Sequence, residues 1–146
     1  MPIELEDKSG NTALTYAAGS TRTSGSNIET VNLLLSKGAN VNHCNAVGYC
    51  PLISAYNGEY LEVVNKLIQN GANVNAQDQG GNTALTWFIV YHPTKTEVIK
   101  LLMNAGANPN LVVHNISGFS KGATAFDLAK KLQLPKTLEI LNRAKK

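Results

Sequence analysis

Three histidines and two cysteines are the residues in this 146-residue chain most able to bind a metal ion or act as nucleophiles. His43, His92 and His114 lie far apart in the sequence, so no two have the spacing of zinc ligands. His43 is adjacent to Cys44, an arrangement that suggests a thiol–imidazole couple. Adjacent residues on an extended hairpin point to opposite faces, so we expect no catalysis by this pair.

Other patterns of catalytic or nucleotide-binding sites are also missing from the sequence. It has no Walker loop and no GxGxxG following a strand, and Gly80-Gly81 is typical of a turn. The acidic residues are scattered and offer no pair for general acid–base catalysis. The sequence therefore predicts a protein that is not an enzyme, with no cofactor, no metal site and no small-molecule substrate.

The two cysteines, Cys44 and Cys50, do not form a CxxC pair. We expect two thiols in a reducing cytosol. The alternative is a disulfide, which needs an oxidising compartment and a close approach of the two residues across one turn.

Composition suits a folded domain. The hydrophobic fraction is 43% and the charged fraction 16%, which argues against disorder. No apolar run approaches the roughly 20 residues of a membrane helix. The N-terminal residues carry no basic region followed by an apolar core, so no classical secretory signal is present. We predict a cytoplasmic protein; the alternative is secretion into a host cell by a signal of another kind.

Charge is unevenly placed along the chain. Residues 121–146 contain seven Lys and Arg against Asp127 and Glu139, although the whole chain has a net charge of only +3. The simplest interpretation is a solvated basic end. The alternative is a patch for nucleic acid, anionic lipid or an acidic partner. Phe126 is the one aromatic residue of this segment, so binding of single-stranded nucleic acid is not expected.

Two motifs recur in phase along the sequence. Gly38-Ala39-Asn40-Val41-Asn42 returns as residues 71–75 and 106–110, at steps of 33 and 35 residues. Gly10-Asn11-Thr12-Ala13-Leu14 returns as residues 81–85, with weaker copies at 48–52 and 122–126. Phased self-similarity of this length indicates a repeat protein.

The pattern resembles the ankyrin-repeat family, whose unit of about 33 residues is a turn followed by two antiparallel helices. The matching pieces are an Asp-x-x-Gly turn, a Thr-Pro-Leu-like start of the first helix, a Val-x-x-Leu-Leu-like second helix and a closing Gly-Ala-x-x-Asn. The resemblance implies an all-α solenoid of helix–turn–helix units with short β-hairpin turns. It implies one domain over residues 1–146, with repeats near 7–42, 43–75, 76–110 and 111–146.

Each motif also has a local physical reason. Thr12, Thr83 and Thr124 can cap the first helices with a side-chain oxygen, whereas Cys50 caps poorly and Pro51 suits the first helical position. The glycines of the Gly-Ala-Asn motifs stand where a second helix must end in a left-handed residue.

Insertions distinguish this chain from the regular unit. Residues 19–25 lengthen the first repeat and predict a flexible loop. Residues 111–121 lengthen the fourth repeat and carry Val112, Val113, Ile116 and Phe119, so we expect this segment to pack partly on the body. Either insertion can serve binding or be neutral drift in an exposed loop.

The family resemblance implies a concave groove, formed by hairpin tips and first helices, that binds a protein partner. Tyr49, Tyr56 and Tyr91 stand out because tyrosine is a favoured anchor at interfaces, whereas Trp87 is expected to pack in the core. Carried onto this sequence, and with two residues of the fourth-repeat insertion added, the predicted partner-binding residues are Lys8, Asn11, Val47, Tyr49, Tyr56, Asn57, Gln79, Asn82, Val90, Tyr91, His92, Phe119, Lys121, Lys130 and Lys131.

The main hypothesis from the sequence is thus a monomeric protein–protein interaction module. One alternative is a targeting domain of a larger enzyme or of a secreted bacterial effector acting on host proteins, because no helix pair precedes Asp7. Another is binding to an anionic surface through the basic C-terminal end. Neither a nucleic-acid partner nor a membrane span is expected.

Overall fold

The computed structural model describes residues 2–20, 27–58, 61–119 and 121–144. All regular elements of these ranges are helical, apart from one isolated antiparallel bridge between Val113 and Ala123. The predicted all-α fold with short hairpin turns is therefore confirmed. The chain divides into two compact units, residues 1–73 and 74–146, and each unit holds two repeats. A single domain over the whole chain stays a prediction.

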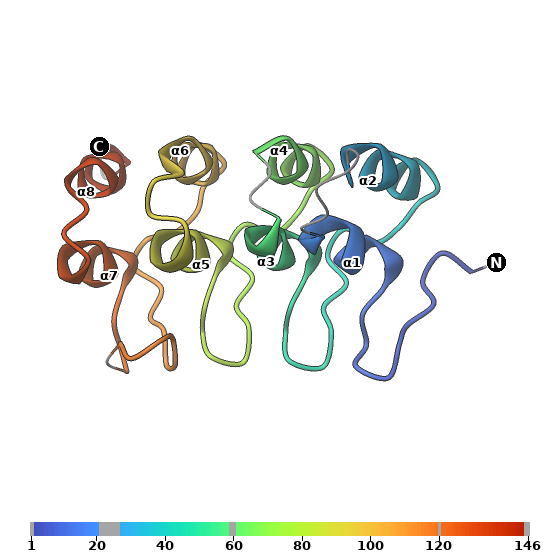
Figure 1. The fold of residues 1–146 in the computed structure, drawn as a ribbon, viewed down its shortest axis with the longest axis horizontal. Helices are drawn as coiled ribbons and strands as arrows, with labels where there is room; N and C mark the ends of the chain where they lie inside the picture. The colour runs from blue at the N-terminus through green and yellow to red at the C-terminus, as the bar shows by residue number, and fades with distance from the viewer. Residues whose placement is uncertain (1, 21–26, 59–60, 120, 145–146) are drawn as a thin grey trace. The chain divides into compact units, whose positions relative to one another are not determined.

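Unit 1 contains α1 (Ala13–Gly19), α2 (Asn27–Ser36), α3 (Pro51–Ser54), the 3₁₀ turn η1 (Ala55–Asn57) and α4 (Leu61–Gln69). Within this unit α1 and α3 form one layer and α2 and α4 a second, and the hairpin turns project beyond the first layer (Figure 1). The layers are held together by apolar side chains that water does not reach. The most buried of them are Leu14, Val31, Leu52, Ile53, Val64 and Leu67.

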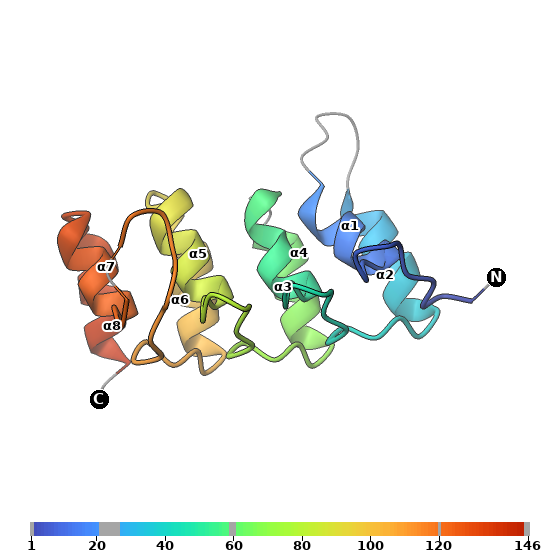
Figure 2. The same cartoon turned by 90° about the horizontal axis from the view of Figure 1, so that it is seen from below.

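Unit 2 repeats this plan with α5 (Ala84–Tyr91), α6 (Thr96–Asn104), α7 (Ala125–Lys131) and α8 (Pro135–Arg143). Seen along the hairpins, α5 and α7 lie in front of α6 and α8 (Figure 2). Helix α5 is apolar on nearly all sides, so six of its eight residues are buried. The innermost side chains of unit 2 are Leu85, Phe88, Ile89, Ile99, Leu102, Leu128 and Leu141. No helix among the described residues is long and apolar enough to cross a bilayer.

The first helices begin as predicted. Thr12, Thr83 and Thr124 have extended backbones, and each side chain accepts a hydrogen bond from the backbone N–H three residues later. Cys50 makes no such bond, and Pro51 occupies the first helical position of α3. A threonine cap is worth about 1 kcal/mol, so α3 lacks one source of stability that the other first helices have.

An asparagine ladder joins consecutive second helices within each unit. In unit 1 the Asn42 amide donates to Gly71 O at 3.0 Å and accepts from Asn73 N at 2.8 Å. In unit 2 Asn75 does the same with Gly106 O at 3.1 Å and Asn108 N at 2.7 Å. One side chain thus satisfies two backbone groups where the following second helix ends, which explains the recurrence of asparagine at this position.

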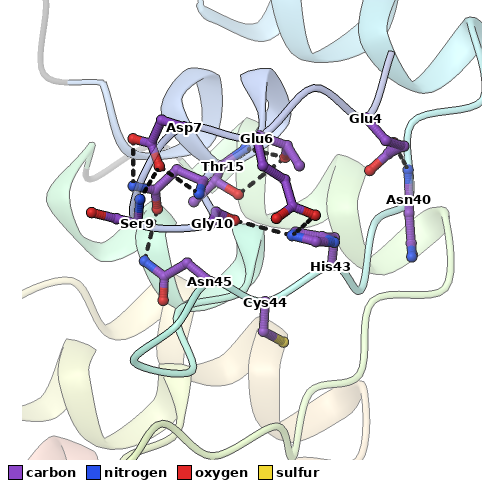
Figure 3. Close-up of polar contacts among 12 residues, drawn as sticks. Glu4, Glu6, Asp7, Ser9, Gly10, Thr15, Asn40, His43, Cys44 and Asn45 are labelled. Atoms are coloured by element: carbon purple, nitrogen blue, oxygen red, sulfur yellow. Dashed lines mark hydrogen bonds and ion pairs between the residues drawn. The ribbon is translucent and has the colours of Figure 1, made fainter. Parts of the chain in front are cut away.

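Glu4 occupies the ladder position of the first repeat. Its Oε1 accepts from Asn40 N at 2.7 Å (Figure 3). In the same way Asn42 Oδ1 accepts from Asn73 N. Its Oε2 is buried and has no hydrogen-bond partner among the described residues. The equivalent atom of Asn42 is a nitrogen that donates to Gly71 O, so a carboxylate supplies only half of the ladder contact.

Glu4→Gln is therefore expected to stabilise the protein by about 1 kcal/mol, because an amide nitrogen can donate to Gly38 O, the counterpart of Gly71 O. Urea denaturation followed by circular dichroism measures the difference. Glu62→Gln, at an exposed carboxylate of the same unit, is the control for loss of one negative charge. A midpoint for Glu4→Gln at or below that of the wild type would contradict the ladder argument.

Candidate functional site

A groove runs along unit 1 between its hairpin tips and its first helices. Its volume is about 800 Å³. We call it the unit 1 groove, and both repeats of the unit contribute to it. It is lined by Lys8, Ser9, Asn11, Thr15, Tyr16, Gly19, Ser20, Asn45, Ala46, Val47, Tyr49, Ser54 and Asn57.

Asp7 builds the first hairpin tip. Its Oδ1 accepts from Ser9 N at 2.8 Å and from Asn11 N at 2.9 Å, which fixes the turn predicted from Asp-x-x-Gly. Its Oδ2 accepts from Asn11 Nδ2 at 3.1 Å and from the Tyr16 hydroxyl. The Tyr16 ring is thereby tethered beside the tip while 59% of the residue stays exposed.

The Asp7–Tyr16 hydrogen bond shifts both pKa values. Donation from the Tyr16 hydroxyl, followed by the bonds from Asn11, holds the pKa of Asp7 well below its usual range. The same bond, together with the negative charge of Asp7, raises the pKa of Tyr16 above 10.0. The pair is therefore stable with the carboxylate charged and the phenol neutral.

This pair should give stability a defined pH dependence. Because the Asp7 pKa is lower in the folded than in the unfolded chain, its contribution is present above about pH 4 and is lost as the pH falls further. The Tyr16 pKa is raised, so its contribution is present below about pH 10 and is lost as the pH rises through the folded pKa. Absorbance titration near 295 nm should show a tyrosine that ionises above pH 10. Tyr16→Phe should remove that late step, and a profile unchanged by Tyr16→Phe would contradict the assignment.

Asn45 builds the second hairpin tip in the same way. Its Oδ1 accepts from Val47 N at 3.0 Å and from Tyr49 N at 2.9 Å, and Gly48 N closes the turn on Asn45 O at 2.9 Å. Val47 stands at the apex with 46% of its surface exposed. The tip thus presents an apolar side chain on a fixed backbone.

The prediction of two thiols at this tip is wrong: Cys44 and Cys50 form a disulfide. The turn that Asn45 closes brings the two Cα atoms to 4.0 Å, so the close approach required for a bridge is met. The disulfide encloses residues 45–49, and Val47 and Tyr49 therefore belong to a covalently closed loop.

The two tips of unit 1 are also bonded to each other. Ala46 N donates to Ser9 O at 2.9 Å, and the Asn45 amide donates to Asn11 Oδ1 at 2.7 Å. Hydrogen bonds within each tip and between the tips hold the edge of the groove in one conformation. Because this edge is already ordered, little conformational entropy is lost when a partner binds there.

His43 makes contacts that join the two repeats of unit 1. Its Nε2 lies 3.0 Å from Gly10 O and 3.4 Å from Glu6 Oε1 (Figure 3). The imidazole thus links the second repeat to the backbone of the first hairpin, and the neighbouring Cys44 is held in the disulfide. No cluster of three or more His, Cys, Asp or Glu that could hold a metal ion occurs in the described part of the chain.

Five of the predicted partner-binding residues line the unit 1 groove: Lys8, Asn11, Val47, Tyr49 and Asn57. Tyr56 was predicted with them, but it is half-buried and does not line the groove.

Unit 2 forms its first tip around a buried carboxylate. Asp78, which is 8% exposed, accepts from Gly80 N at 2.8 Å and Asn82 N at 2.9 Å. Its Oδ2 accepts from the indole N–H of Trp87 at 2.9 Å. Trp87 is buried, in agreement with the core position predicted for it.

The fourth-repeat insertion covers this tip. His114 N donates to Gly80 O at 2.6 Å, and Val113 and Ile116 are buried. The expectation that the insertion packs on the body is therefore confirmed. The Asn82 amide donates to Asp78 and to Asn115 O at 3.0 Å, and Asn82 is 2% exposed. The insertion thus leaves Asn82 almost no exposed surface, and its contact with a partner stays a prediction.

The insertion continues to the C-terminal ends of α5 and α7. Tyr91, which is 44% exposed, stacks on Trp87 at a centroid distance of 5.1 Å and shares a hydrogen bond with Ser117. The Lys131 ammonium lies 4.8 Å from the centre of the Phe119 ring. The insertion thus contacts predicted residues of both first helices, through Ser117 at Tyr91 of α5 and through Phe119 at Lys131 of α7.

The other residues predicted in unit 2 differ in exposure. Gln79, Lys121 and Lys130 are exposed, whereas Val90 and His92 are half-buried. His92 follows the last residue of α5, and its ring packs at 5.8 Å from that of Phe88. His92 therefore has a packing contact in addition to its partly exposed surface.

Tyr16 is the main groove residue that the sequence prediction missed. A signal for it exists in the chain: Tyr16 follows Asp7 by nine residues, as Trp87 follows Asp78, and both aromatic residues donate to the turn carboxylate. In the second repeat the same positions are Asn45 and Ser54. The spacing places a residue of the first helix over the turn, so a hydrogen-bonding aromatic residue there indicates the pairing.

Comparison with known families supports the repeat assignment. A family model of ankyrin repeats, in three copies, matches residues 2–78, 20–113 and 52–145. These matches together cover nearly the whole chain. No curated protein matches the sequence.

Proposed function

Because the chain belongs to the ankyrin-repeat family, we propose that it binds a partner protein through the hairpin tips and first helices of its units. Ankyrin repeats are in general protein–protein interaction modules and form a non-catalytic interaction fold. We propose in addition that the chain has no enzymatic activity of its own.

The unit 1 groove is the observation that carries the proposal. Tyr16 and Val47 present 59% and 46% of their surface beside a groove whose edges are tied by hydrogen bonds. A large aromatic side chain with its hydroxyl already bound loses little entropy on binding and buries much apolar area. Such residues are the usual anchors of protein interfaces, so Tyr16 and Val47 are the expected anchors here.

The experiment is affinity capture from a lysate with quantitative mass spectrometry, comparing variants of matched size. Tyr16→Ala with Val47→Ala removes both anchors. Leu33→Ala with Leu61→Ala removes two exposed apolar side chains from α2 and α4, away from the groove. Proteins bound by the wild type should be lost by at least tenfold from the groove variant and retained by the control.

Circular dichroism of both variants provides the check that the fold is intact. Equal capture by the folded groove variant and the wild type would overturn the proposal for unit 1. Loss of capture by the Leu33 and Leu61 control alone would move the interface to the second helices.

The cellular compartment of the protein is a separate question from its binding surface. A cytoplasmic site of action stays a prediction, as does secretion into a host cell. The Cys44–Cys50 disulfide favours an oxidising compartment. Mass measurement of the protein from its native source, with and without thiol alkylation, decides between the thiol and disulfide forms.

A further inference from the structure

Unit 2 carries an excess of positive charge that its own carboxylates do not neutralise. Residues 74–146 contain nine Lys and Arg but only four Asp and Glu. Asp78 is buried against Trp87, Glu97 pairs with Lys100 at 2.8 Å, and Glu139 pairs with Arg143. These contacts leave few negative charges for the remaining lysines.

The fourth carboxylate, Asp127, caps α7. Its Oδ2 accepts from the backbone N–H of Thr124 at 2.9 Å and from the Thr124 hydroxyl at 2.8 Å, and these bonds lower its pKa. It lies in the first turn of α7, and the charge of Lys130, three residues further on, adds to the lowering of its pKa. Among the described residues no carboxylate forms an ion pair with Lys121, Lys130 or Lys131.

One of these lysines lies against an aromatic side chain, and the other two are close neighbours of that pair in the sequence. Lys131 contacts the Phe119 ring, and Lys121 follows Phe119 by two residues. Tyr91 is joined to the same segment through Ser117 and is backed by Trp87. In Figures 1 and 2 this segment runs beside α5 and α7 on the hairpin side of unit 2. We call Tyr91, Phe119, Lys121, Lys130 and Lys131 the basic patch.

We propose that the basic patch binds an acidic segment of a partner protein, in which carboxylates flank an apolar or aromatic side chain. This inference rests on the proposed function and names the chemistry of the partner for unit 2. The unpaired lysines supply the charge complementarity, and the rings of Tyr91 and Phe119 supply apolar area for a side chain between the carboxylates.

The geometry favours a protein segment over the other anionic partners. Single-stranded nucleic acid is bound by stacking successive bases on aromatic rings. Here Lys131 covers one face of Phe119 and Trp87 one face of Tyr91, so each ring keeps one face for a single partner side chain. A membrane surface is recognised by clusters of about 4–8 basic residues on one element. Here the cations and rings come from α5, the fourth-repeat insertion and α7, which suits a partner that presents charge and apolar area together.

The test is fluorescence anisotropy with labelled probes of defined composition. The first probe is a 12-residue peptide with one phenylalanine between glutamates, and the second has glutamine at every glutamate. A 12-nucleotide single strand of thymidines and vesicles containing phosphatidylserine serve as competitors. Trp87 gives a second readout, because it is the one tryptophan of the chain and stacks on Tyr91.

Two charge-reversal variants locate the binding. Lys130→Glu with Lys131→Glu changes the patch, and Lys37→Glu with Lys66→Glu changes the net charge equally in unit 1. The glutamate peptide should bind the wild type at least tenfold more tightly than the glutamine peptide. The patch variant should lose about tenfold in affinity, equivalent to about 1.4 kcal/mol, and the unit 1 variant less than twofold. Binding should weaken as salt is raised.

The inference would be wrong if the two peptides bound equally well, or if both charge-reversal variants lost the same affinity for the glutamate peptide. It would also be wrong if the oligonucleotide or the vesicles displaced the labelled peptide at a lower concentration than unlabelled peptide does. If the charge-reversal variant of the patch unfolds, Lys130→Gln with Lys131→Gln is used in its place. This variant should also bind the glutamate peptide more weakly than the wild type. The peptide experiment can fail while protein capture still depends on Tyr16 and Val47. In that case the inference about the basic patch is wrong and the proposed function of the unit 1 groove is unaffected.

Discussion

Asp78→Ala is expected to lower the free energy of unfolding by about 3–5 kcal/mol, because it leaves several buried donors without an acceptor. Asp78 accepts from Gly80 N, from Asn82 N and Nδ2, and from the Trp87 indole, and it is 8% exposed. Water cannot replace a carboxylate that is covered by the fourth-repeat insertion. Urea denaturation followed by circular dichroism gives the loss, and Trp87 fluorescence reports on the site itself.

Asp7→Ala is the matched control, because Asp7 makes the same turn bonds and an aromatic contact on the surface. Solvent can reach its donors, so the loss of stability should be much smaller than for Asp78→Ala. Equal losses at the two positions would show that burial by the insertion contributes nothing, and the account of the unit 2 tip would be wrong.

Gly81→Ala is expected to destabilise the protein by about 3 kcal/mol for two reasons that add together. Gly81 has φ +75°, a left-handed conformation that costs a residue with a Cβ about 1–2 kcal/mol. The added Cβ would also lie 2.8 Å from Val112 O and 2.9 Å from His114 Cδ2. The insertion would have to move away, which would weaken the bond from His114 N to Gly80 O.

Gly106→Ala separates these two causes. Gly106 has φ +94°, but a Cβ there meets no atom within 4 Å. Its cost should therefore be the conformational part alone, about 1–2 kcal/mol. The two variants are compared by the same denaturation experiment. A cost for Gly81→Ala no larger than for Gly106→Ala would mean that the insertion does not pack closely on the tip.

Much of the fold could be predicted from local signals. Thr12, Thr83 and Thr124 cap helices, and Gly38, Gly71 and Gly106 adopt positive φ, as their motifs predict. These features depend on a few neighbouring residues, and they recur in phase, so each copy supports the others. The exposed Lys8, Val47 and Asn57 of the unit 1 groove follow from the same phasing.

The structure differs from the sequence predictions at single residues and leaves the repeat itself unchanged. Asn82 occupies a position that the repeat pattern assigns to a partner surface, yet the insertion, more than 30 residues further along the chain, buries it. Tyr56 lies where α3 passes into the 3₁₀ turn η1 and does not line the unit 1 groove, so its part in partner binding stays a prediction. Cys44 and Cys50 form a disulfide instead of the expected thiols, because the turn between them brings them closer than their spacing in the sequence reveals.

The repeat, its helix pairs, its turn residues and the lack of a recognisable catalytic motif can be read from the sequence, because each of these depends on local chemistry repeated in register. Which polar side chains are used internally, and which remain for a partner, depends on how distant segments pack. The reason is that a hydrogen-bonding residue looks the same in the sequence whether its partner is water or a segment more than 30 residues away. Asp7 and Asp78 are the same residue in the same motif, and packing by residues 111–119 makes Asp78 a buried group while Asp7 stays at the surface.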